Sequence, residues 1–198
     1  MYRGGVAPSS PAYQSTEKEI EVVKMNSDYY TYAKKMLDQG SIKAAEEAFK
    51  NGVQNGDIKC FYGLVAVAAI TGTDMEPSID RLRRVLPEIL KNCVNNDPDA
   101  CFIIGRCYEM GLGFTPNLCS AMYYYEKAAT MGNPDAMYNM GCIYMSIDPC
   151  GVEMALGWFH KAADCGLPNA YRALSHYYRQ AGDVEEAEKW EKFLSDQN

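Results

Sequence analysis

A pattern of small and aromatic residues occurs three times along the chain, at intervals of 36 and 34 residues. In each copy Pro-x-Ala is followed by a small residue five positions later and by Tyr three positions after that. The copies are Ala100, Gly105 and Tyr108; Ala136, Gly141 and Tyr144; and Ala170, Ser175 and Tyr178. This period is typical of stacked helix hairpins, because a single hairpin cannot bury its apolar face. The sequence therefore predicts an all-α chain, a right-handed α-solenoid of about five antiparallel hairpins.

Clusters of Gly, Pro, Asn and Asp separate the apolar segments and mark the expected helix ends. They stand at Gln39-Gly40, Asn55-Gly56, 72–77, 95–98, 111–116, 132–134, 148–151, 166–168 and Ala181-Gly182. Apolar and polar residues do not alternate with the two-residue period of a strand, so we expect none. Gly132 and Gly166 should each follow the second helix of a hairpin, where a residue with positive φ is common.

The sequence divides into a tail and one long repeat region. Residues 1–15 are rich in Gly, Pro and Ser and are expected to be disordered. The pattern Thr16-x-x-Glu19 is a capping box, from which a helix can begin. We therefore predict a single repeat domain over 16–198. Within it, repeats are degenerate over 28–99 and clear over 100–135 and 136–169, and 170–198 forms a C-terminal cap.

The segment 100–132, "ACFIIGRCYEMGLGFTPNLCSAMYYYEKAATMG", resembles the Sel1-like repeat family, a relative of the tetratricopeptide repeats. The matching positions are Ala100, Ile104, Gly105, Tyr108, Gly111, Gly113, Ala121, Tyr125, Lys127, Ala128, Ala129 and Gly132. The copy at 136–166 is similar, although its loop is two residues shorter. The last copy ends in a more tetratricopeptide-like helix with a polar face, which suits a terminal cap. The resemblance implies an α-solenoid that acts as a protein-interaction scaffold.

Eight cysteines are present, but no Cys-x-x-Cys motif or zinc-binding Cys/His cluster occurs. Because no secretory signal precedes them, we expect reduced thiols that are buried as small hydrophobic groups. Cys93 and Cys101 nevertheless have the spacing of the cysteine pair that joins adjacent helices in secreted members of the resembled family. The resemblance thus leaves a Cys93–Cys101 disulfide as the alternative.

Charge and hydropathy exclude several partner classes. The net charge is −7, of which −5 lies in residues 101–198, and no Lys/Arg-rich run occurs, so we expect no nucleic-acid partner. The longest apolar stretch, "GLVAVAAITG" at 63–72, is too short to span a membrane and predicts a buried helix. The N-terminus lacks the apolar segment of a signal peptide. We therefore expect a cytoplasmic chain without a membrane partner.

The sequence offers no set of catalytic residues. It has only two histidines, and His160 is expected at a solvated helix position. No nucleophile elbow, phosphate-binding loop or dinucleotide fingerprint occurs. The Gly-x-Gly of "GLGF" at 111–114 follows a helix, so it is expected to be a hairpin loop. We therefore predict a protein that is not an enzyme and has no cofactor and no metal.

The first helices of the clear repeats carry a second pattern, a stripe of aromatic, Met and basic residues. Arg172, His176 and Arg179 stand at positions i, i+4 and i+7 of one expected helix, so they share one face of it. Such side chains are enriched at interface cores. The predicted concave binding face is formed by Phe102, Arg106, Tyr138, Met145, Arg172, His176 and Arg179. Its alternative is a solvated helix face without a partner.

These patterns predict an adaptor that binds a peptide or helix with an acidic group in the groove of a solenoid. Two other functions stay open. One is a secreted cysteine-rich relative with β-lactam-binding or hydrolase activity, against which stand the missing Ser-x-x-Lys pattern and the scarcity of His. The other is a structural or regulatory subunit whose partner contacts one end of the array.

Overall fold

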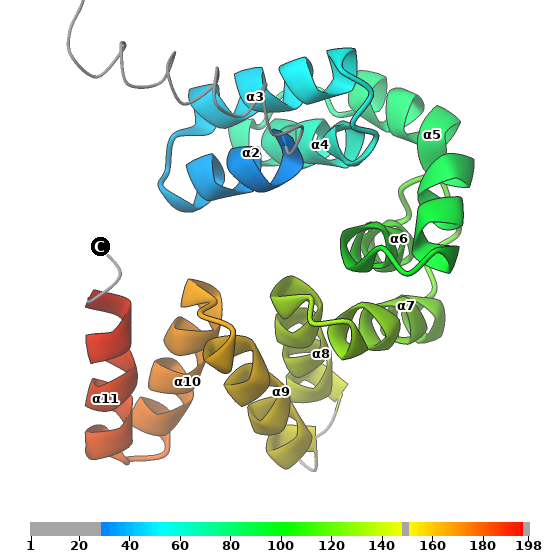
Figure 1. The fold of residues 1–198 in the computed structure, drawn as a ribbon. Coiled ribbons are helices and arrows are strands. Elements are labelled where there is room, and N and C mark those ends of the chain that lie inside the picture. Colours follow the sequence, from blue (N-terminus) through cyan, green and yellow to red (C-terminus); the bar gives the residue numbers. More distant parts are fainter. Residues whose placement is uncertain (1–28, 148–150, 196–198) are drawn as a thin grey trace, which may run out of the picture. The chain divides into compact units, whose positions relative to one another are not determined.

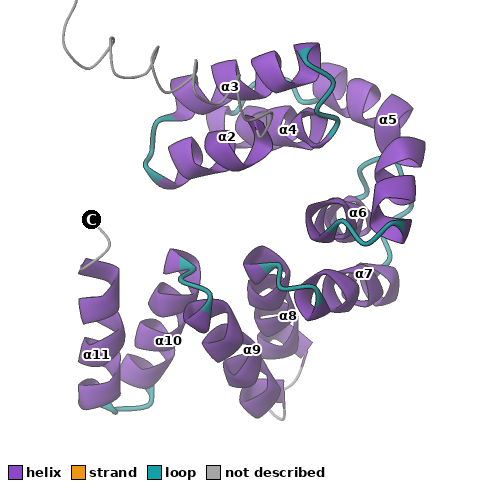
Figure 2. Ribbon diagram, in the orientation of Figure 1, coloured by secondary structure: helices purple, strands orange, loops and turns teal. Residues whose placement is uncertain are grey.

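The computed structural model describes residues 29–147 and 151–195, and over these ranges the chain forms ten helices and no strand (Figures 1 and 2). The helices are α2 (Tyr29–Asp38), α3 (Ile42–Gln54), α4 (Lys59–Thr71), α5 (Glu76–Val94), α6 (Pro98–Met110), α7 (Leu118–Thr130), α8 (Pro134–Ile147), α9 (Val152–Asp164), α10 (Pro168–Gln180) and α11 (Val184–Ser195). The all-α repeat fold is confirmed. The expected tail at 1–15 and the capping box at 16–19 lie outside the described residues.

The helices group into two compact units, which divide between Val85 and Leu86. The division falls inside α5, a helix of 19 residues that also contains Pro87. Proline has no backbone N–H, so this helix lacks one of its internal hydrogen bonds there. The single domain over 16–198 stays a prediction, and each unit is described by itself.

In the first unit α2 and α3 form a hairpin, and α4 packs against both of them. Helix α4 contains residues 63–71 of the apolar stretch; its first part is buried, as the sequence predicts, whereas residues 69–71 are exposed. Phe49 of α3 is 1% exposed and lies against Gly63 of α4, where a Cβ atom would collide with the ring. The core of this unit is therefore built from close helix contacts at small residues.

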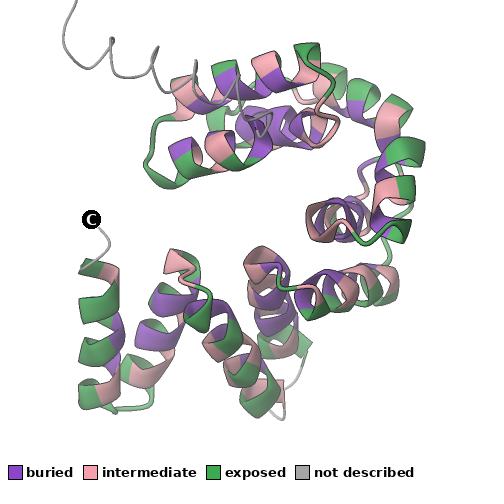
Figure 3. Ribbon diagram, in the orientation of Figure 1, coloured by how far each residue is buried: buried purple, intermediate pink, exposed green. Residues whose placement is uncertain are grey.

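The second unit consists of the hairpins α6–α7, α8–α9 and α10–α11, with α7 packed on α8 and α9 packed on α10 (Figure 1). Each of these helices contains both buried and exposed residues (Figure 3). The recurring small residues lie where the first helix meets an aromatic ring of the second. A Cβ added to Gly105 would lie 2.6 Å from the Tyr125 ring, and one added to Gly141 would lie 2.5 Å from the Phe159 ring.

Two polar contacts join residues that are one repeat length apart in the sequence. Asn133 Nδ2 donates to Asp99 Oδ1 at 2.8 Å, and Lys127 Nζ donates to the Cys93 carbonyl at 2.8 Å. Both pairs are 34 residues apart. Gly132 and Gly166, which follow α7 and α9, have φ values of 90° and 81°, as the sequence predicts.

Among the described residues, every helix is too short or too polar to span a membrane.

Candidate functional site

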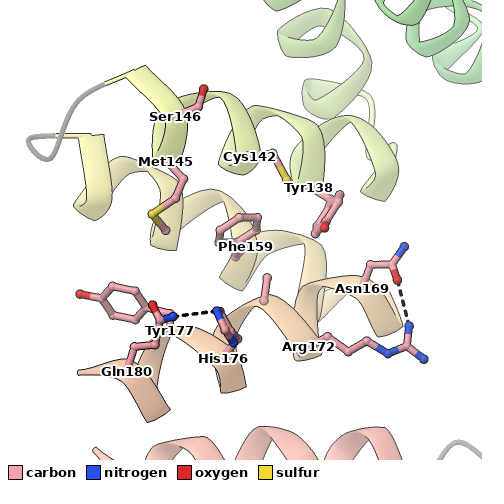
Figure 4. A pocket seen from close by; sticks show the side chains of 11 residues that line it. Tyr138, Cys142, Met145, Ser146, Phe159, Asn169, Arg172, His176, Tyr177 and Gln180 are labelled. Carbon is pink, nitrogen blue, oxygen red and sulfur yellow. Dashed lines mark hydrogen bonds between the residues drawn. The ribbon is translucent and has the colours of Figure 1, made fainter. Parts of the chain in front are cut away.

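A cavity of about 650 Å³ opens between α8, α9 and α10 in the second unit (Figure 4). It is lined by Tyr138, Cys142, Met145 and Ser146 of α8, by Phe159 of α9, and by Asn169, Arg172, Ala173, His176, Tyr177 and Gln180 of α10. We call it the α8–α10 cavity. Because α8 and α10 are the first helices of consecutive hairpins, the repeat itself creates the space between them.

The α8 wall of the cavity is uncharged at neutral pH. Tyr138, Cys142 and Met145 stand at i, i+4 and i+7 and so share one helix face. Burial, with a smaller contribution from neighbouring Cys142, raises the pKa of Tyr138 to about 12, and Arg172 opposes the shift. Burial also raises the pKa of the Cys142 thiol. Both groups therefore keep their protons, and this wall offers ring carbon, sulfur and a phenol.

The floor of the cavity is Phe159, which the figure shows between the α8 and α10 side chains (Figure 4). Phe159 is 3% exposed, and its ring centroid lies 5.6 Å from that of Tyr138. Gly141 leaves the space that this ring occupies, since any Cβ atom there would overlap it. The small residue that the repeat places in α8 thus determines where the floor lies.

The α10 wall is polar and carries the positive charge. Arg172, His176 and Gln180 follow one another at intervals of four residues. Arg172 Nη1 donates to Asn169 Oδ1 at 2.9 Å, and His176 Nε2 lies 3.0 Å from Gln180 Nε2 (Figure 4). These contacts orient the guanidinium and the imidazole and bring no carboxylate to either of them.

No carboxylate is present among the lining residues. Within the described part of the chain, Arg172 makes its hydrogen bond to the amide oxygen of Asn169 and has no ion pair. This cation stands in a region, 101–198, whose net charge is −5. The cavity therefore combines apolar surface with an uncompensated positive charge, which suits an anionic group attached to an apolar body.

Four of the seven residues predicted for the binding face line the α8–α10 cavity: Tyr138, Met145, Arg172 and His176. Two of the others are engaged elsewhere in the second unit. Phe102 is 7% exposed and packs against the Tyr125 ring at 5.9 Å, so it belongs to the core. Arg106 Nη1 forms an ion pair with Glu109 Oε2 at 2.7 Å, and its Nη2 lies 3.1 Å from Met110 Sδ.

Arg179 does not belong to the cavity either. Its Nη2 lies 2.6 Å from Glu191 Oε1 of α11, which also accepts a hydrogen bond from Ser175 Oγ at 2.9 Å. The hydrogen bonds from Arg179 and Ser175 lower the pKa of Glu191. The stripe predicted on α10 is therefore divided: Arg172 and His176 face the cavity, whereas Arg179 is compensated by the next helix.

Phe159 is the main lining residue that the predicted binding face does not include, because that face is built from the first helices of the repeats and Phe159 lies in a second helix. Its sequence signal is its equivalence to Tyr125 of the preceding copy, since both rings lie over a recurring glycine. Asn169 and Gln180 extend the stripe of Arg172 and His176 toward the two ends of α10. The same helical spacing therefore points to them.

The cysteines differ from the expectation of eight reduced, buried thiols. Cys93 and Cys101 form a disulfide with an S–S distance of 2.02 Å between the end of α5 and the start of α6. Cys60 and Cys107 are buried free thiols, and burial raises the pKa of Cys107 to about 12. Cys119 and Cys165 are exposed, because they lie beside the ends of α7 and α9, away from the packed faces.

The prediction that His160 is solvated is wrong. It is half-buried, its Nε2 lies 3.3 Å from the Tyr178 hydroxyl, and its ring centroid is 5.3 Å from that of Trp190. The terminal hairpin α10–α11 covers this position, which the sequence of α9 alone does not indicate. Among the described residues, no cluster of three or more His, Cys, Asp or Glu side chains is placed to hold a metal ion.

The fold and the site define a class of protein: an all-helical repeat protein of the tetratricopeptide-like type, with a cavity between the first helices of neighbouring hairpins. Residues 98–133 and 134–167 match the family model of the Sel1 repeat. These are the two copies in which the sequence pattern is clearest. The hairpins α6–α7 and α8–α9 are thus similar to Sel1 repeats.

Solved structures share this fold. The crystal structure of a Sel1 repeat protein from Oxalobacter formigenes is 26% identical, with a TM-score of 0.51 over 58% of this chain and 91% of that one. The immunity protein PA5088 from Pseudomonas aeruginosa is 18% identical, with a TM-score of 0.52 over 96% of this chain and 67% of that one. The second likeness shows the fold alone.

Two curated relatives are both named DAP3-binding cell death enhancer 1. The protein from Rattus norvegicus is 31% identical over 109 residues, which are 53% of this chain and 21% of the relative. The protein from Mus musculus is 33% identical over 84 residues, which are 41% of this chain and 16% of the relative. The chain thus spans about a fifth or less of the length of these relatives.

Proposed function

We propose that this protein is a non-enzymatic adaptor whose α8–α10 cavity binds a segment of a partner protein that carries an acidic group. Sel1 repeats typically mediate protein–protein interaction, and the curated relatives are named for binding DAP3. The observation that carries the proposal is Arg172, an uncompensated cation on the wall of a cavity without carboxylates. The partner's acidic side chain ion-pairs with Arg172, and its apolar neighbours cover Phe159 and Met145.

The chemistry of the cavity fits equilibrium binding better than turnover. Tyr138 and Cys142 have raised pKa values, so neither provides a phenolate or a thiolate nucleophile at neutral pH. The remaining polar lining groups are two amides, the hydroxyls of Ser146 and Tyr177, an imidazole and a guanidinium, which suit the binding of an anion. Oriented side chains on a rigid helical scaffold reduce the cost of binding, because less ordering occurs at the interface.

The test is a selection of displayed random peptides on the full chain. Peptides enriched on the wild-type protein should be rich in Asp and Glu, and Arg172→Glu should weaken their binding at least tenfold. Arg84→Glu is the matched control: Arg84 is an exposed arginine of α5 outside the cavity, and its substitution changes the net charge equally. Binding that is equally strong in all three proteins would exclude the cavity as the site.

A further inference from the structure

We infer that the occupant of the α8–α10 cavity is an amphipathic helix of the partner protein, two to three turns long. Its apolar face lies on α8 and Phe159, and two acidic side chains one turn apart face Arg172 and His176. The inference rests on the proposed function and specifies the conformation and the pattern of its partner.

The walls of the cavity have the length of a short helix. The lining residues of α10 run from Asn169 to Gln180, and those of α8 run from Tyr138 to Ser146. With a rise of 1.5 Å per residue, these walls are about 16 Å and about 12 Å long. A partner helix of about 8 to 11 residues, lying along α8 and α10, would cover them from end to end.

The distribution of polar atoms favours a helix over an extended segment. An extended segment exposes backbone N–H and C=O groups on both of its edges, and these groups are costly to bury without partners. On the α8 wall the hydroxyls of Tyr138 and Ser146 stand only at the two ends. Cys142 and Met145 between them, and Phe159 on the floor, offer no strong partner to a backbone amide or carbonyl. On the opposite wall, the Asn169 and Gln180 amides already contact Arg172 and His176. A helix satisfies its own backbone and presents only side chains to both walls.

The spacing of the polar wall sets the pattern of the partner. Arg172 and His176 are four residues apart on α10, which is about 6 Å along the axis. Acidic residues at i and i+4 of an opposing helix have the same spacing and face the same way. One carboxylate would pair with the guanidinium of Arg172, and the other would accept a hydrogen bond from the imidazole of His176.

The contrast between the two walls sets the apolar face of the partner. Tyr138 and Cys142 of the α8 wall stay protonated, so this wall carries no charge. Acidic residues directed at it would lose their hydration without gaining a partner. Leu, Met or aromatic residues at i, i+3 or i+4, and i+7 suit the surface formed by Met145 and Phe159. The partner is therefore amphipathic, with its acidic and apolar stripes side by side.

The experiment uses as probes the acidic peptides selected on the full chain. Each peptide is remade with proline at a central position outside its acidic and apolar stripes, and with alanine at that position as the control. Proline breaks a helix, whereas an extended segment tolerates it. We expect proline to weaken binding at least tenfold and alanine to change it less than threefold. Circular dichroism should also show helix formation when the unmodified peptide binds.

A second pair of variants tests the apolar wall. Met145→Glu places an acidic side chain on the α8 wall and should weaken the binding of the selected peptides at least tenfold. Met154→Glu is the control, because Met154 is an exposed methionine of α9 outside the cavity.

The outcomes separate the two proposals. Binding that depends on Arg172 but tolerates the central proline overturns the helix and leaves the acidic-segment proposal standing. Binding that is indifferent to both Arg172 and Met145, or the absence of any selected acidic peptide, overturns both proposals.

Discussion

The second unit and the first unit each contain a recess with arginine in its lining, but the two recesses differ in whether carboxylates line them as well. The first unit has a smaller space of about 190 Å³, whose lining includes Arg81 and Lys50 together with Glu46 and Asp74. The α8–α10 cavity has a lining arginine and no carboxylate. In the smaller recess Glu46 already forms an ion pair with Lys50 at 2.6 Å, and the lining carboxylates repel an anionic partner. The difference identifies the α8–α10 cavity as the better candidate for binding.

The largest expected effect is on the floor of the cavity. Phe159→Ala should lower the free energy of unfolding by about 3–5 kcal/mol and should abolish peptide binding, because Phe159 is both buried and part of the lining. Phe49→Ala in the first unit should cost a similar amount of stability and leave binding intact in the folded protein. Urea unfolding followed by circular dichroism, together with peptide titration, measures both effects. Equal loss of binding in the two variants would contradict the assignment of the floor.

The next effect compares the two arginines directly. Arg172→Gln should weaken the binding of the selected acidic peptides about tenfold, which corresponds to about 1.4 kcal/mol of binding free energy. Arg81→Gln should leave their affinity within about twofold, because Arg81 lines the recess that also contains Glu46 and Asp74. Calorimetric titration of the same peptides on both variants checks this prediction. A larger loss in Arg81→Gln would move the binding site to the first unit.

A smaller effect concerns the glycines that lie under aromatic rings. Gly141→Ala should destabilise the protein by about 1–3 kcal/mol, because the added Cβ atom overlaps the Phe159 ring and forces it to move. Gly157→Ala is the control, since nothing lies within 4 Å of a Cβ atom at that position. Thermal unfolding of the two variants provides the comparison. If Gly141→Ala were as stable as wild type, the ring would have room to shift and the floor would not be fixed.

The smallest expected effect is a dependence on alkaline pH. The pKa of Tyr138 is raised to about 12 from the ordinary value of 10, so the folded state holds this proton more tightly than the unfolded state does. Its contribution to stability is therefore complete below pH 10 and is lost between pH 10 and pH 12. Tyr138→Phe should flatten that part of the stability curve, as measured by urea unfolding at several pH values. If Tyr138→Phe had the same slope of stability against pH as the wild type, the Tyr138 hydroxyl would be as well hydrated in the folded state as in the unfolded chain.

Several features of the fold follow from local pattern and can be predicted from the sequence. The recurring Pro-x-Ala, small residue and Tyr set the repeat length, and the Gly and Pro clusters set the helix ends. Gly132 and Gly166 have the positive φ that their positions predict, because this conformation is local to the chain. Gly105 and Gly141 are small because aromatic rings of the paired helix occupy the adjacent space. All of these features arise within a single hairpin, that is, between residues close together in the sequence. The sequence pattern of one repeat is therefore enough to predict them.

The division of the predicted binding face depends on side chains from separate helices. The spacing on α10 places Arg172, His176 and Arg179 on one stripe, yet Glu191 of α11 pairs with Arg179 and removes it from the cavity. Phe102 belongs to the same predicted face, but α7 covers it through Tyr125. His160 is covered by Tyr178 and Trp190 of the terminal hairpin. No local pattern reveals which neighbour reaches a given side chain.

The sequence by itself determined the helices, their period and the positions of close packing, because these follow from steric and periodic rules within about 34 residues. Only the tertiary structure decided which charges are compensated and which are not. That outcome depends on distances between side chains of different helices, such as the 2.6 Å between Arg179 and Glu191, which spacing along one helix does not contain. Arg172 is left uncompensated because no acidic side chain of a neighbouring helix reaches it within the described residues.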